Sequence, residues 1–123
     1  GDVDLSWRIL SRGGSLVLAP DALVQHACRP TLRSFYRQYR TYSSGHALLF
    51  SKHRLPNARY CFDPYPVHLV TGALRQLVSI GRGGSDARSR CATMRSALLQ
   101  FIEATALVDG AIRGSMRHRV LYL

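Results

Sequence analysis

The spacing of apolar side chains predicts a short helix at the start of the chain. Apolar residues recur at steps of three and four over the first ten positions and form one broad face: Val3, Leu5, Trp7, Ile9 and Leu10. Asp2 and Asp4 fall in the first turn, where the helix dipole favours negative charge. Gly13 and Gly14 are expected to end the helix, because glycine is common just past a helix C-terminus.

Residues 15–25 predict two short extended segments joined by a turn. An apolar run at 16–18 is bounded by glycine and Pro20, and a second run at 23–25 follows Pro20 and Asp21. Short apolar runs between turn-forming residues are typical of strands. We therefore expect a short β-hairpin, or a pair of extended segments, near the N-terminus.

A longer helix is predicted over about residues 31–53. Pro30 suits the first turn of a helix, and apolar or aromatic side chains follow at steps of three and four: Leu32, Phe35, Tyr36, Tyr39 and Tyr42. Basic side chains line another side: Arg33, Arg37 and Arg40. Residues 43–45, Ser-Ser-Gly, are expected to kink or interrupt the helix, because glycine lowers helix propensity by ~1 kcal/mol relative to alanine.

The stretch 54–66 contains three prolines and an asparagine, which is typical of a connector. Beyond it, residues 67–80 and about 87–112 predict two further helices. The glycine-rich stretch 81–85 separates them. The chain is therefore expected to be mostly α-helical.

Basic side chains cluster in the last third of the chain: Arg82, Arg88, Arg90, Arg95, Arg113, Arg117 and Arg119. Neither predicted helix there has the ~20 uninterrupted apolar residues of a membrane span, because Arg75 divides the first and Glu103 and Asp109 divide the second. The pattern fits two helices lying at an anionic membrane surface, and it equally fits two helices that pack on each other.

The whole chain carries a formal net charge of +10, from 17 lysines and arginines against 7 carboxylates. Such a charge attracts anions, including diphosphates, anionic lipid headgroups and nucleic acid. Cys28, Cys61 and Cys91 are odd in number and far apart, so a disulfide framework is not predicted and a reducing cytosol fits.

A series of motifs in the first half carries more information than the charge. Asp2-Val3-Asp4-Leu5 with Arg8 is followed by Gly13-Gly14, the apolar run ending at Pro20, and a second run ending at His26. The basic and aromatic helix comes next. This order resembles the C-terminal end of the catalytic domain of family 2 glycosyltransferases, which have a GT-A fold, and the mycofactocin-type members most.

The resemblance implies an α/β GT-A-like fold that is incomplete in this chain. Residues 1–53 would be the C-terminal part of the catalytic domain, 54–66 the connector, and 67–123 a helical extension for which a membrane surface is one of the two locations left open. The nucleotide-binding βαβ units and the Asp-x-Asp motif of the family would lie outside this chain. Taken by itself, the chain is therefore expected to be an inactive fragment.

In the family, the second residue of the motif Glu-Asp-x-Asp-Leu-x-x-Arg is the general base, and this role matches Asp2. Asp4 and Arg8 also match, whereas Gly1 stands where the family has Glu. Asp4 and Arg8 are four residues apart and are expected to form an ion pair on one helix face. Without the resemblance, the two aspartates would be interpreted as carboxylates that satisfy free N–H groups at a helix start.

His26 stands where GT-A enzymes often have a histidine that contacts the metal–diphosphate group. A neutral imidazole can bind a divalent cation, so the resemblance implies Mg or Mn in the full-length enzyme, with none bound by this fragment alone. Without a partner ligand at metal spacing, His26 is only a weak metal candidate. We assign no role to the remaining histidines: His46, His53, His68 and His118.

Processive relatives carry Gln-x-x-Arg-Trp where this chain has Arg37, Gln38, Arg40 and Tyr42. Gln38 is not followed by Arg-Trp at that spacing, so processivity is not predicted. Arginine can neutralise a diphosphate and tyrosine can stack on a sugar ring, which predicts diphosphate or acceptor contacts for these four residues. An ordinary amphipathic helix with a solvated basic face is the equally good alternative.

The sequence thus predicts the C-terminal portion of an inverting glycosyltransferase that moves a sugar from a nucleotide-sugar donor to an acceptor hydroxyl. It would be cytoplasmic, with peripheral contact at the inner face of the plasma membrane. The alternative is a basic helical module that binds an anionic membrane surface or nucleic acid. No helix-turn-helix, zinc-finger or RNA-recognition pattern is present, so specific nucleic-acid binding is not expected.

Overall fold

The computed structural model describes residues 2–25, 29–53, 60–82 and 86–123. The described residues are mostly helical. The helices are α1 (Asp2–Ser11), α2 (Leu32–His53), α3 (Tyr65–Gly81) and α4 (Ala87–His118). Two short strands, β1 (Tyr60–Cys61) and β2 (Leu121–Tyr122), form a parallel pair.

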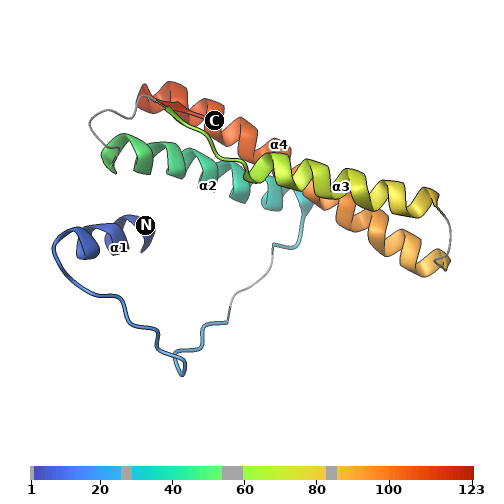
Figure 1. Ribbon diagram of the computed structural model, residues 1–123, viewed down its shortest axis with the longest axis horizontal. Helices are drawn as coiled ribbons and strands as arrows, with labels where there is room; N and C mark the ends of the chain where they lie inside the picture. The colour runs from blue at the N-terminus through green and yellow to red at the C-terminus, as the bar shows by residue number, and fades with distance from the viewer. Residues whose placement is uncertain (1, 26–28, 54–59, 83–85) are drawn as a thin grey trace.

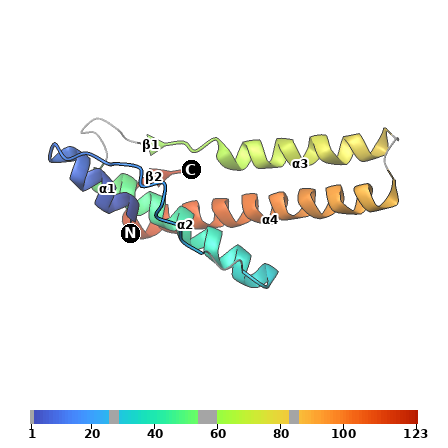
Figure 2. The same cartoon turned by 90° about the horizontal axis from the view of Figure 1, so that it is seen from below.

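Helix α4 is the centre of the arrangement, because both α2 and α3 pack against it (Figure 1). Helix α2 runs parallel to α4, and α3 runs antiparallel to it as one arm of a helical hairpin. The half of this hairpin that includes its tip projects beyond α2 in both views (Figure 2). Helix α1 lies beside the C-terminal end of α2 and is joined to it by the long extended segment.

Small residues bring α2 and α4 into close contact. A Cβ atom built on Gly110 would meet the carbonyl oxygen of Arg40 and would lie 2.8 Å from the Cβ of Ser43. A Cβ on Gly114 would lie 2.8 Å from the Cβ of Ala47. Ser43 and Ala47 are both buried. The two backbones therefore approach as closely as they do only because these positions have little or no side chain.

This contact explains why one prediction was wrong. Residues 43–45 were expected to interrupt the second helix, yet α2 is continuous from Leu32 to His53. The low helix propensity of serine and glycine is offset by the packing of Ser43 against α4. Tertiary packing commonly overrides such local preferences.

The α3–α4 hairpin matches the predicted break at 81–85, of which residues 83–85 lie outside the described residues. Helix α3 begins after Pro64 and ends at Gly81. Asp86 caps α4 by accepting a hydrogen bond from the backbone N–H of Ser89. Helix α4 runs six residues past the predicted end at 112, to His118, and is followed by Arg119 in the left-handed conformation.

Of the two alternatives predicted over residues 15–25, the described structure has the pair of extended segments and not the β-hairpin. The segments around Pro20 are extended and separated by a turn, but within the described residues they form no β-hairpin. The parallel pair instead joins β1 to β2 at the C-terminus. Tyr122 in β2 is buried against α2, near Phe50, and the Ser115 hydroxyl both donates to and accepts from its backbone.

The extended segment exposes most of its apolar side chains. Exposed fractions reach 88% for Val17 and 92% for Leu23. The expected connector also begins outside the described residues, at 54–59, and continues through β1 to the start of α3. Within the described ranges, none of the helices combines the length and apolar character needed to cross a bilayer.

The glycine contact between α2 and α4 makes a stability prediction. Gly114→Ala should destabilise the chain by about 1–3 kcal/mol, because the added methyl group overpacks a backbone contact. Gly45→Ala is the matched control, since a Cβ at Gly45 has nothing within 4 Å, and it should stabilise α2 by up to ~1 kcal/mol. Urea unfolding would measure both, and equal stabilisation by the two alanines would contradict the close contact.

Candidate functional site

The carboxylate of Asp4 is the meeting point of three basic side chains from two helices. His53 Nε2 lies 2.8 Å from Oδ1, while Lys52 Nζ lies 3.7 Å and Arg8 Nε 3.4 Å from Oδ2. The predicted ion pair between Asp4 and Arg8 is confirmed. The other two partners come from the last turn of α2, so this group of four residues, here called the Asp4 cluster, attaches α1 to α2.

The surroundings of Asp4 favour its charged form. The hydrogen bond with His53 lowers the pKa of Asp4, the nearby charges of Lys52 and Arg8 lower it further, and partial burial opposes them. The side chain of Asp4 is 14% exposed. Trp7 packs edge-on against the imidazole of His53, with 5.2 Å between ring centroids. The carboxylate is therefore held by the protein, which suits a role in positioning α1.

Asp2, the predicted general base, lies in the first turn of α1, two residues before Asp4. Its side chain lies outside what the structure describes. The helix that carries Asp2 is nevertheless held in place by the Asp4 cluster.

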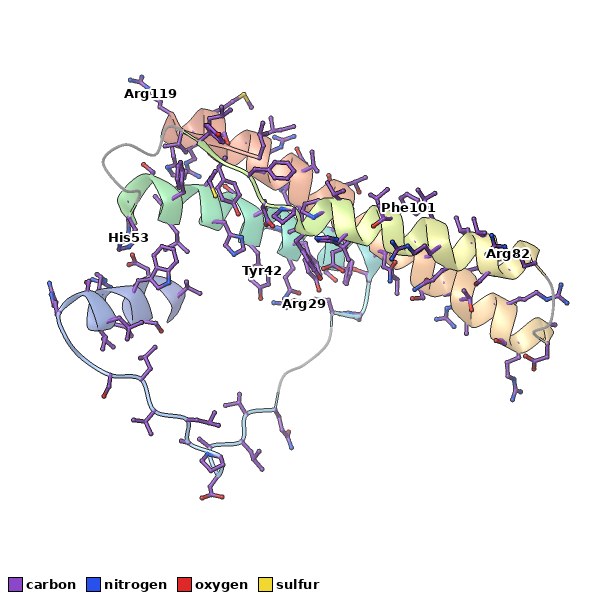
Figure 3. All side chains as sticks on the ribbon, in the orientation of Figure 1. Arg29, Tyr42, His53, Arg82, Phe101 and Arg119 are labelled. Atoms are coloured by element: carbon purple, nitrogen blue, oxygen red, sulfur yellow. The ribbon has the colours of Figure 1, made fainter. Side chains whose placement is uncertain are left out.

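A polar pocket of about 380 Å³ lies between Arg29 and the N-terminal half of α2. Its walls come from both charged and neutral side chains: Arg29, Ser34, Arg37, Gln38, Thr41 and Tyr42. Arg29 Nε donates to Gln38 Oε1 at 3.1 Å, and Gln38 Nε2 donates to the hydroxyl of Tyr42 at 2.8 Å. Figure 3 shows Arg29 and Tyr42 near each other beside the N-terminal half of α2.

Besides His26, four residues of α2 were predicted to contact diphosphate or acceptor, and the pocket joins three of them: Arg37, Gln38 and Tyr42. Two guanidinium groups line it together with a hydroxyl-bearing ring. Guanidinium groups bind phosphate through paired hydrogen bonds, and a phenol ring can lie against a sugar. The pocket is thus chemically suited to an anion carried on, or beside, a sugar.

The fourth residue, Arg40, lies outside the pocket. Its guanidinium is 3.9 Å from Asp109 Oδ2 in α4. Asp109 also accepts hydrogen bonds from Arg113, at 2.6 Å, and from the hydroxyl of Tyr36, at 3.1 Å. The Arg113 contact, above all, lowers the pKa of Asp109. Arg40 therefore faces a carboxylate at the α2–α4 contact and is partly neutralised by it.

His26 lies outside the described residues, so its predicted metal contact stays a prediction. Within the described ranges, no three histidine, cysteine or carboxylate side chains are grouped to hold a metal ion. Cys61 and Cys91 are free thiols.

Three residues that make side-chain contacts at these sites were missed from the sequence: Lys52, His53 and Arg29. His53 had been assigned no role, and it stands 49 positions from Asp4, a separation at which no periodicity relates two residues. Arg29 was not singled out because it precedes the predicted helix and therefore belongs to none of its faces. Only the fold brings each of them to its partner.

Comparison with known proteins gave no relative. No protein-family model matches the chain, and no curated protein or solved structure matches it.

The Asp4 cluster predicts an acid-dependent release of α1. Because the pKa of Asp4 is lowered in the folded chain, its contacts stabilise the docked helix above the ordinary aspartate pKa of ~3.9 and are lost as the pH falls through the lowered pKa. Trp7, the single tryptophan, should then show a red-shifted emission. Asp4→Asn should show that shift at neutral pH.

Asp21→Asn is the control for this experiment, because Asp21 is an exposed aspartate in the turn of the extended segment. It should leave the emission of Trp7 unchanged. Far-UV circular dichroism would separate release of α1 from loss of the other helices. An unchanged Trp7 emission in Asp4→Asn would show that the cluster does not hold α1.

Proposed function

We propose that this chain is the C-terminal portion of an inverting, nucleotide-sugar-dependent glycosyltransferase of family 2. The observation that supports it most is the polar pocket, which is lined by Arg29, Arg37, Gln38 and Tyr42. Three of these four residues, Arg37, Gln38 and Tyr42, are ones to which the family resemblance assigns diphosphate or acceptor contacts. A segment of the same chain carries the Asp-x-Asp-Leu-x-x-Arg motif at the start of α1.

In this proposal Asp2 is the general base. The acceptor oxygen attacks the anomeric carbon of the donor sugar, and the bond from that carbon to the diphosphate oxygen breaks on the opposite side. The hydroxyl proton passes to the carboxylate of Asp2, and the electron pair leaves with the nucleoside diphosphate. General-base assistance of this kind is typically worth 10²–10⁴-fold in rate.

The other residues have supporting roles. Asp4 accepts contacts from Arg8, Lys52 and His53, so it positions α1 and leaves Asp2 as the carboxylate assigned to the acceptor. The arginines of the pocket would neutralise the charge of the leaving diphosphate. His26 is proposed to contact the metal–diphosphate group, for which Mg or Mn would supply charge neutralisation in the full-length enzyme.

The exposed extended segment also fits this proposal. Residues 16–18 and 23–24 are apolar, yet nearly all of this surface lies open to solvent. Apolar extended segments are stable when they pack against a sheet or helix layer. A donor-binding half with a GT-A sheet would provide that layer.

The general-base assignment is tested by Asp2→Asn in the full-length protein that carries this chain. Sugar transfer from the nucleotide-sugar donor should fall by about 10²–10⁴-fold in kcat, with a smaller effect on KM, because amide nitrogen cannot accept the proton. Asp21→Asn is the matched control and should keep wild-type rates. The 123-residue chain alone should show no transfer, and transfer by it would contradict the proposal.

The pocket is tested separately with the 123-residue chain and inorganic pyrophosphate. Arg37→Gln should weaken binding by about tenfold or more, since a hydrogen bond to a charged group is worth ~1.5–3 kcal/mol. Arg33→Gln removes the same charge from an exposed position of the same helix and should cost much less. Isothermal titration would measure both, and equal losses would show a diffuse field with no defined pocket.

A further inference from the structure

One side of the α3–α4 hairpin is a long apolar surface that no other described element covers. Its large side chains are each between 41% and 56% exposed, and they come from both helices: Val67, Leu74, Leu77, Val78, Met94, Leu98, Val108 and Ile112. We call this surface the hairpin face. Monomeric proteins seldom leave a contiguous apolar surface of this kind without a partner.

Two grooves hold six of these eight side chains. Near the tip, Leu77 of α3 lines a groove of about 360 Å³ together with Met94, Leu98 and Phe101 of α4. Toward the base, a groove of about 540 Å³ runs between α3 and α4, lined mostly by apolar side chains that include Val67, Val108 and Ile112. On α4, the positions 94, 98, 101, 105, 108 and 112 follow steps of three and four, so they lie along one stripe of the helix.

Arginines border the hairpin face on its outer sides. Arg95 lines the groove near the tip, and Arg88 lies seven residues before it, hence on nearly the same line of α4. Arg75 lies in α3 and Arg82 is the residue that caps its C-terminal end, and Figure 3 shows Arg82 at the tip. The long apolar stem of arginine can lie along an apolar surface while its charged end reaches outward.

These arginines have no carboxylate partner among the described residues. No ion pair involves them or Arg90, whereas the described pairs lie at Asp4 and Asp109. Between positions 72 and 102 the chain has a single carboxylate, Asp86, and it is engaged as the cap of α4. The half of the hairpin near its tip therefore carries a net positive charge beside an open apolar face.

We propose that the hairpin face binds the surface of an anionic lipid bilayer. The apolar side chains enter the boundary between headgroups and acyl chains, and the bordering arginines contact lipid phosphates, as is typical of amphipathic helices that lie in a membrane interface. The hairpin lies on the surface and does not cross the bilayer. This binding is independent of sugar transfer, so its failure and the failure of the proposed enzyme activity are separate results.

Charge selects the bilayer over a second copy of the chain. Two hairpin faces placed together would bring two sets of unpaired arginines to one interface, and like charges in an interface are costly. An anionic bilayer supplies both an apolar phase and opposite charge. Each basic residue near such a surface raises the affinity about fivefold.

Co-sedimentation of the 123-residue chain with vesicles tests the proposal. Vesicles of equal parts phosphatidylcholine and phosphatidylglycerol should bind the chain, and phosphatidylcholine alone should bind it far more weakly. The triple variant Arg88→Gln, Arg90→Gln, Arg95→Gln should lose on the order of 100-fold in affinity. The control triple Arg12→Gln, Arg33→Gln, Arg117→Gln has the same net charge and should lose much less.

A second pair of variants tests the apolar component. Leu98 and Leu16 are both 54% exposed, and Leu98→Gln should weaken vesicle binding several-fold while Leu16→Gln should not. Equal effects within either matched pair would overturn the proposal in favour of diffuse attraction by the net charge. Absence of vesicle binding together with a dimer that Leu98→Gln dissociates would overturn it in favour of a second copy.

Discussion

The close approach of α2 to α4 is the constraint on which the rest of the structure depends. Gly110 and Gly114 leave room for the backbone and small side chains of α2, so two long helices share a contact without large buried side chains. Helix α4 packs against α2 and also against α3, which forms the other arm of the hairpin. The chain that follows α4 forms β2, which pairs with β1. Ser115 and Tyr122 secure that last connection through paired hydrogen bonds.

The distribution of charge follows from the same architecture. Of the seven carboxylates, Asp4 attaches α1 to α2, Asp109 pairs with arginines at the α2–α4 contact, and Asp86 caps α4. Among the described residues, most arginines are left without a carboxylate partner. The excess of arginines over carboxylates leaves two different basic surfaces. One is the polar pocket along α2, and the other is the apolar hairpin face with its bordering arginines.

These two surfaces differ in what accompanies the charge. In the pocket, arginine is combined with an amide and a phenol that are already hydrogen-bonded to each other, which suits a small polar anion. On the hairpin face, arginine is combined with exposed leucine, valine and methionine, which suits a lipid surface. The net charge of +10 predicts attraction to anions in general, and the neighbouring side chains decide which kind of anion fits.

The sequence by itself determined the presence and approximate position of the helices, since these depend on periodicity, on glycine and on capping residues that act within a few positions; the end of α4 was missed by six residues. It also determined the Asp4–Arg8 pair, because four residues on a helix place two side chains on one face. Tertiary structure alone decided that α2 continues through residues 43–45, that His53 reaches Asp4, that Arg29 joins Gln38, and that the strands pair at the C-terminus. Each of these depends on packing between residues far apart in the chain, and local spacing contains no information about such contacts.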